Sequence, residues 1–198
     1  AYGGILKSGN KATTLKFYLE LMHPEIVVDS HEKNFYAQDI TDQINDYDYI
    51  IFTVGSSDIQ LQLNRILKEK NIKSRVLFAW LEAGGEHSHI LSIDYHQQGC
   101  FECLFTDGKG DLINNKVNVV EEDIVISNTI SNGCGATRVA YGSAVILRTV
   151  SVLLTFIKEI ESGAKEENCL INIAPDKVVY DFDTFEEKRC RCCGDKTQ

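Results

Sequence analysis

Two pairs of cysteines constrain this chain more than any other feature of its sequence. Each pair has the spacing C-x-x-C, and the pairs lie 90 positions apart at Cys100/Cys103 and Cys190/Cys193. This spacing lets two thiolates bind one tetrahedral ion from a tight turn, and two pairs supply the four ligands of a structural zinc site. We therefore predict one zinc ion that ties the end of the chain to its middle.

Two other interpretations of these cysteines stay open. One pair could be a redox dithiol and the other a coincidental cluster, and Cys192 could replace Cys193 as a ligand. A disulfide framework is disfavoured, because seven cysteines in a 198-residue chain without a secretion signal argue for metal binding or catalysis.

Composition and charge exclude several classes of function. No apolar run reaches the roughly 18 residues of a membrane span. The formal net charge of -9 and the pI of about 5.0 argue against a nucleic-acid partner. We expect a cytoplasmic protein without a membrane or nucleic-acid partner, and a basic protein or carrier tail is the more natural ligand.

The hydrophobic pattern predicts an α/β fold with one strand–helix–strand unit. Tyr49 to Val54 and Arg75 to Leu81 are continuous apolar runs typical of buried strands, and Ser57 to Lys70 between them has helical periodicity. Such a unit implies a right-handed parallel crossover. We expect a Rossmann-like, mostly parallel sheet with flanking helices and a mixed or antiparallel extension. The strands expected in this extension are His89 to Tyr95, Leu170 to Ile173 and Val178 to Phe182.

Several further elements are predicted with less regular patterns. They are a helix from Asn10 to His23, a short strand from Ile26 to Asp29, a weak helix from Tyr36 to Asn45, a mobile crossover loop over residues 106–133 and a long apolar helix from Thr137 to Ile160. The loop is too long for an ordinary connector, so we expect it to be functional.

Segments in this order and spacing resemble the adenylation domains of the ThiF/MoeB/ubiquitin-activating family, and the similarity covers nearly the whole chain. The segments that carry it are Lys11 to Pro24, Tyr49 to Ser57, Leu63-Asn64, Gly99 to Leu104, Val179 to Asp181 and Cys193-Gly194. A finer similarity, from Trp80 to Ala83 followed by Gly84, Gly85 and His89, is to bacterial ThiF-type enzymes that act with conjugating-enzyme domains in antiviral systems such as CBASS.

The resemblance implies that ATP adenylates the carboxy-terminal glycine of a ubiquitin-like protein or similar protein tail. It further implies a homodimer, and transfer of the tail through a cysteine thioester to a conjugating enzyme. Lys11 matches the family lysine that contacts ATP phosphates. Gly55 and Ser56 stand where the family usually has an aspartate, which helps to hold magnesium, and an asparagine, so Asp58 could substitute.

The family opens with a strand and a glycine-rich turn, whereas this sequence contains no G-x-G-x-x-G. We therefore expect residues 1–198 to be a single partial adenylation domain whose amino-terminal nucleotide-binding part is missing. Two alternatives to a conjugating activity stay open. The chain could be a noncatalytic, zinc-stabilised partner subunit, or an adenylyltransferase for a sulfur-carrier protein.

Cys134 is the candidate nucleophile. Glycines flank it, and it lies at the junction where family members carry their thioester cysteine. A helix amino terminus close by would stabilise its thiolate. A small buried cysteine at a helix start is the alternative, and the same interpretation dominates for Cys169. His87 and His89 could contact a substrate tail beside Glu82, although polar residues near a turn are more often simply solvated.

Overall fold

The computed structural model describes residues 9–33, 42–119, 129–131, 137–139, 142–182, 185 and 190–194. The chain divides into two compact units, Ala1–Asp39 and Ile40–Gln198. Each unit is considered by itself.

The first unit contains one helix, α1 (Lys11–Met22). Asn10 caps it, since its side chain accepts a hydrogen bond from the amide of Ala12 at 2.8 Å. The amide of Val28 donates to Glu20 at 3.1 Å, which holds the following segment against the helix. The helix is confirmed, but the strand predicted from Ile26 to Asp29 is wrong, because no strand lies beside it to pair with among the described residues of this unit.

A five-stranded sheet is the centre of the second unit, and its order is β1-β2-β3-β6-β7. β1 pairs parallel with β2, whereas the other three pairs are antiparallel. The predicted α/β fold with a parallel strand–helix–strand unit and an antiparallel extension is confirmed. Contrary to the expectation, the described sheet is not mostly parallel, because the antiparallel extension forms its larger part. The strands are β1 (Tyr49–Phe52), β2 (Arg75–Leu81), β3 (Ser88–Ile93), β6 (Cys169–Ile173) and β7 (Val178–Asp181).

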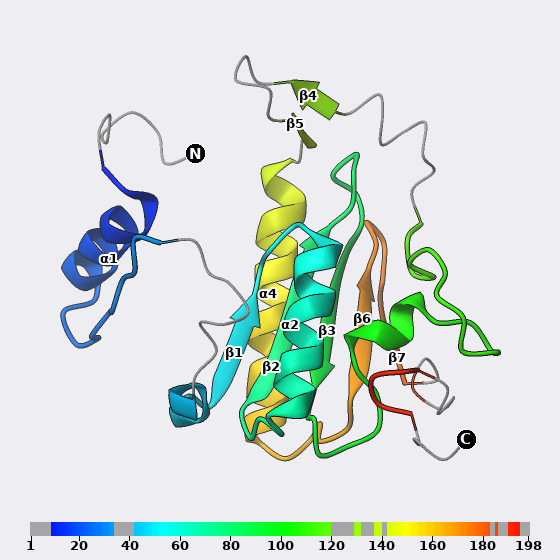
Figure 1. Cartoon of the computed structure of the whole chain (residues 1–198). Coiled ribbons are helices and arrows are strands. Elements are labelled where there is room, and N and C mark those ends of the chain that lie inside the picture. The colour runs from blue at the N-terminus through cyan, green and yellow to red at the C-terminus, as the bar shows by residue number, and fades with distance from the viewer. Residues whose placement is uncertain are drawn as a thin grey trace. The chain divides into compact units, whose positions relative to one another are not determined.

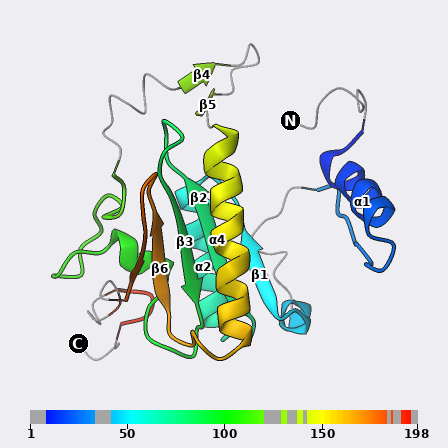
Figure 2. The same cartoon turned by 180° about the vertical axis from the view of Figure 1, so that it is seen from behind.

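Helices cover both faces of this sheet (Figures 1 and 2). α4 (Ser143–Glu161) packs on one face, where Leu153 and Phe156 join the core residues Leu77, Ile90 and Ile171. α2 (Ser57–Glu69) lies on the other face, together with the short helix η3 (Phe101–Phe105). Helices pack on both faces because β2 is a continuous apolar run, so the side chains on each of its faces need to be buried.

Aromatic rings fill the α2 side of the sheet. Phe78 in β2 stacks on Phe52 of β1 at 5.3 Å between ring centroids and contacts Phe101 of η3 at 4.8 Å. Phe101 also meets Trp80 edge-on at 5.9 Å. This cluster therefore joins the parallel strands to the segment that carries the first cysteine pair.

The remaining elements differ in part from the prediction. Residues Thr137–Val139 form strand β5, which pairs with β4 (Thr129–Ser131), so the long helix begins only after Gly142. β4 also lies within residues 106–133, for which a loop was predicted. The weak helix expected from Tyr36 to Asn45 falls mostly outside the described residues, and its described end belongs to the 3-10 helix η2 (Asp42–Asp46).

Candidate metal centre and nucleotide edge

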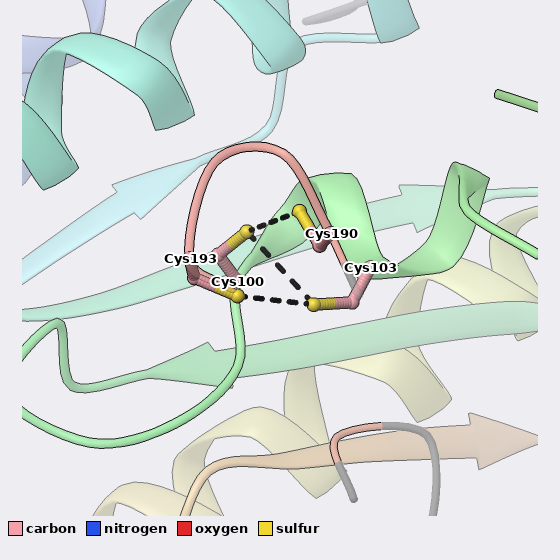
Figure 3. Close-up of side chains that lie close together, drawn as sticks. All are labelled: Cys100, Cys103, Cys190 and Cys193. Carbon is pink, nitrogen blue, oxygen red and sulfur yellow. Dashed lines mark hydrogen bonds between the residues drawn. The ribbon is translucent and has the colours of Figure 1, made fainter. Parts of the chain in front are cut away.

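The four predicted cysteines come together in one cluster. Figure 3 shows their side chains converging, with one pair at the start of η3 and the other on the carboxy-terminal segment. The sulfur atoms all lie within 4.8 Å of one another. Individual Sγ–Sγ distances are 4.0 Å for Cys100–Cys103, 3.6 Å for Cys100–Cys190 and 3.4 Å for Cys103–Cys193.

This geometry fits a tetrahedral metal ion. Zinc–sulfur bonds of about 2.3 Å place the four sulfurs of a tetrahedron about 3.8 Å apart, and the distances in the cluster scatter around that value. Cys100, Cys103 and Cys190 are buried, and Cys193 is half-buried. The cluster could therefore hold a metal ion shielded from solvent, which is the property of a structural site.

Cys192 is not a member of this cluster. Its sulfur accepts a hydrogen bond from the side-chain amide of Asn64 at 3.4 Å, and its backbone amide donates to the sulfur of Cys190 at 3.3 Å. These contacts place Cys192 beside the cluster as an outer partner. Cys193 rather than Cys192 thus completes the set of four.

The thiols of the four cysteines are shifted in pKa in different directions. Hydrogen bonds with Cys100 and Cys103 lower the pKa values of the Cys190 and Cys193 thiols. Hydrogen bonds with the other thiols, together with burial, raise the pKa of Cys100. Thiolate is the form that binds a metal.

Residues of α2 and η3 support the cluster. Glu102, which is fully buried, accepts a hydrogen bond from Arg65 Nε at 2.7 Å and contacts the sulfur of Cys190 at 3.6 Å. Asn64, also fully buried, accepts from the hydroxyl of Tyr95 at 3.0 Å and from the amide of Phe101 at 2.9 Å. Sequence reasoning missed these roles. The signal was there, since Asn64 is a polar residue on the apolar face of a helix.

The second predicted site lies where β1 ends and α2 begins. Ser56 is the N-cap of α2, and its side chain makes no capping hydrogen bond. Gly55 and Asp58 are exposed on either side of it. Ligands of parallel α/β units bind at the carboxyl ends of the strands, and helix amino termini there attract phosphate groups. The structure thus brings Gly55, Ser56 and Asp58 together at such an edge, and nucleotide binding by them stays a prediction.

The other predicted site residues are distributed differently. Lys11 opens α1 in the first unit, and no arrangement between the two units is described. Cys134 lies outside the described residues. Cys169 is buried in β6, where burial raises the pKa of its thiol to about 12, so it is a core residue. His87 is half-exposed, while His89 is buried and hydrogen-bonded to Glu82.

None of the described helices is both long and apolar enough to span a membrane. Comparison with solved structures finds E. coli MccB at 15% identity and a TM-score of 0.63, covering 96% of this chain and 51% of MccB. E. coli MccB solved with MccA-N7isoASN, and with AMPCPP and MccA, matches at 16% identity with TM-scores of 0.63 and 0.62 and coverage of 94% of this chain. The chain spans about half the length of these neighbours.

No curated protein sequence matches the chain. Among protein families, the ThiF family matches residues 5–192, which include Cys100, Cys103 and Cys190 of the cluster. The family resemblance noted from the cysteine pairs and the segment Lys11 to Pro24 is thereby confirmed. The chain belongs to the ThiF family.

Proposed function

We propose that the protein containing this chain uses ATP to adenylate the carboxy-terminal glycine of a ubiquitin-like protein or a similar protein tail. A carboxylate oxygen of the tail attacks the α-phosphorus of ATP, and pyrophosphate leaves. The match to the ThiF family over residues 5–192 carries this proposal. The neighbouring structures of MccB with AMPCPP and with MccA support it.

The proposed ligands follow from the two sites. A zinc ion held by Cys100, Cys103, Cys190 and Cys193 stabilises the fold, because four thiolates are a zinc ligand set. ATP and magnesium bind at the edge formed by Gly55, Ser56 and Asp58, and Lys11 contacts the phosphates. A lysine suits this role as a point charge opposite a polyanion. The cytoplasm suits the reaction, since thiols stay reduced there.

Exchange of radioactive pyrophosphate into ATP tests the proposal. The full-length protein should catalyse this exchange with a tail that ends in glycine and not with the same tail lacking its last glycine. Lys11→Ala should slow the exchange, and Lys16→Ala on the same helix is the control. Absence of exchange with every candidate tail would argue against adenylation.

We further propose that Cys134 takes over the activated tail as a thioester, which then passes to a conjugating enzyme. The thiolate attacks the acyl carbon of the adenylate, and AMP leaves. Cys134→Ala should abolish the thiol-sensitive adduct with the tail while pyrophosphate exchange continues. Cys169→Ala is the matched control, because a thiol with a pKa of about 12 supplies almost no thiolate. An adduct that persists in Cys134→Ala would favour the sulfur-carrier alternative.

From the family resemblance we also propose that the protein forms a homodimer and that it acts in antiviral defence of the CBASS type. Cross-linking of the full-length protein tests the first. Phage challenge of cells that carry or lack the gene tests the second.

The noncatalytic alternative has one specific observation in its favour, which is the lack of a carboxylate at Gly55. Replacing this residue tests it. A β-carbon at Gly55 would meet no atom within 4 Å, so Gly55→Asp should fold normally, with a melting temperature within about 2 °C of wild type. If the edge binds ATP and magnesium, the added carboxylate should lower the magnesium concentration needed for exchange. Gly55→Ala is the control, and an equal magnesium requirement in both variants would contradict this assignment.

A further inference from the structure

Three hydrogen-bonded polar side chains cross the sheet at the carboxyl end of β2, and of these Glu82 and His89 are buried and Asn172 is half-buried. The side chains of Glu82 and His89 are 5% and 1% exposed, and Nε2 of His89 lies 2.5 Å from Oε1 of Glu82. Nδ1 of His89 lies 2.8 Å from Oδ1 of Asn172. His89 pairs with Trp80 of β2 and with Asn172 of β6 in the strand register, so all three side chains share one face.

Glu82 also holds the backbone of a distant segment. The amide of Val119 donates to both carboxylate oxygens of Glu82, at 3.1 and 3.0 Å. The side chain of Val119 is 60% exposed, so these hydrogen bonds, rather than apolar burial, hold the residue in place. Glu82 and Val119 are 37 positions apart, and they join the β2–β3 hairpin to the end of the loop Thr106–Val119.

The second half of the loop Thr106–Val119 is also anchored to η3. The amide of Ile113 donates to the carbonyl of Phe105 at 2.8 Å, and the amide of Lys116 donates to the carbonyl of Leu104 at 2.9 Å. These two bonds tie the loop to η3. Glu82 attaches the loop at the sheet edge as well. This attachment fixes the path of the chain after Lys116.

A backbone hydrogen bond and two glycines shape the hairpin that carries Glu82. The amide of Glu82 donates to the carbonyl of His87 at 2.9 Å, and Gly84 and Gly85 adopt positive φ angles of 90° and 73° that close the turn. The imidazole of His89 stacks on Trp80 with 5.0 Å between centroids. Burial of a carboxylate costs free energy unless the group is paired. Here each hydrogen bond that pairs the carboxylate also fixes its position.

We propose that Glu82 is a positioning residue, which holds Val119 and the loop Thr106–Val119 at the carboxyl edge of the parallel strands as a wall of the protein-tail site. His89 and Asn172 fix Glu82 in turn. Glu82 is too buried to touch a substrate, and ligands of parallel sheets bind at this edge. The assignment of the tail site rests on the proposed function.

Hydrogen exchange and enzyme kinetics on the full-length protein test this role. Glu82→Ala removes both acceptors of Val119, whereas Glu82→Gln keeps one carbonyl acceptor in the same place. Glu86→Ala, in the same hairpin but exposed, is the control. The measurements are amide exchange at Val119, the fluorescence of Trp80, which is the only tryptophan in the chain, and the KM values for tail and ATP in pyrophosphate exchange.

We expect the Val119 amide to exchange about tenfold faster or more in Glu82→Ala, because a hydrogen bond to a charged group is lost. Trp80 fluorescence should change with it, and the KM for the tail should rise while the KM for ATP stays constant. Glu82→Gln should lie between Glu82→Ala and the control. If Glu82→Ala does not fold, the comparison of Glu82→Gln with Glu86→Ala still decides the question.

Two results would overturn the proposal. Val119 exchange equal to that of Glu86→Ala would show that Glu82 does not hold the loop. Faster exchange with an unchanged KM for the tail would show that the contact is structural only. If the wild-type protein shows no pyrophosphate exchange, the proposed function fails, and amide exchange still reports whether Glu82 holds Val119.

Discussion

Cys103→Ser is expected to release the metal ion and to unfold much of the second unit. Cys103 is 4% exposed and lies 3.4 Å from the sulfur of Cys193, so it joins the two halves of the cluster. Serine is neutral at this position and is a poor zinc ligand. Binding of a structural zinc ion supplies on the order of 10 kcal/mol, which is comparable to the whole stability of a domain.

Elemental analysis and thermal unfolding measure this effect. Wild-type protein purified without chelator should contain one zinc ion per chain, and Cys103→Ser should contain almost none and should melt without a cooperative transition. Cys192→Ser is the matched control, because Cys192 lies in the same turn but outside the cluster. Equal zinc content and equal melting temperatures in the two variants would contradict a structural metal site.

The cysteine cluster could be predicted from the sequence because its information is local. A C-x-x-C pair offers two thiolate ligands from one tight turn wherever it occurs. A structural zinc ion needs four ligands, so two such pairs in one chain are expected to bind one ion together. The β1-α2-β2 unit was predictable for a similar reason, since buried strands and an amphipathic helix have different periods. In both cases each part of the signal is local, since the two cysteines of a pair are three positions apart and the period of a strand or helix is visible within a single segment.

Features that depend on which segments of the chain pair in the folded protein could not be predicted from the sequence. Residues Thr137–Val139 come shortly before a long apolar helical pattern and are predicted as part of the same helix, but they form a strand because residues Thr129–Ser131 pair with them. The pairing of Glu82 with Val119 likewise depends on how the chain returns from η3 to the sheet. The order of neighbouring strands in the antiparallel extension is of the same kind, because β3 pairs with a strand that comes after α4 in sequence.

The contacts of Asn64 belong to this second group and give the other large expected effect. Asn64 lies on α2 and is 0% exposed. Its side-chain oxygen accepts from the hydroxyl of Tyr95 and the amide of Phe101, and its nitrogen donates to the sulfur of Cys192. Burial raises the pKa of Tyr95, so its hydroxyl keeps the proton that it donates.

Asn64→Ala should therefore destabilise the protein by about 3–5 kcal/mol, because each buried donor left without an acceptor costs about 1–3 kcal/mol and a small cavity adds to the cost. The melting temperature should fall by on the order of 10 °C. Because Phe101 lies between the first two cysteines of the cluster, the variant should also lose zinc to a chelator faster than wild type. Gln62→Ala, at an exposed position of the same helix, is the control for lost helix contacts.

Asn64→Asp separates the acceptor role of this side chain from its donor role. It keeps an oxygen for Tyr95 and Phe101 but loses the donor to Cys192 and places a carboxylate beside the cysteine cluster. If the acceptor role dominates, Asn64→Asp should be closer in stability to wild type than Asn64→Ala is. Zinc release should be faster in both variants, since each loses the contact with Cys192. Stability and zinc release equal to those of Gln62→Ala would show that Asn64 does not connect α2 to the metal site.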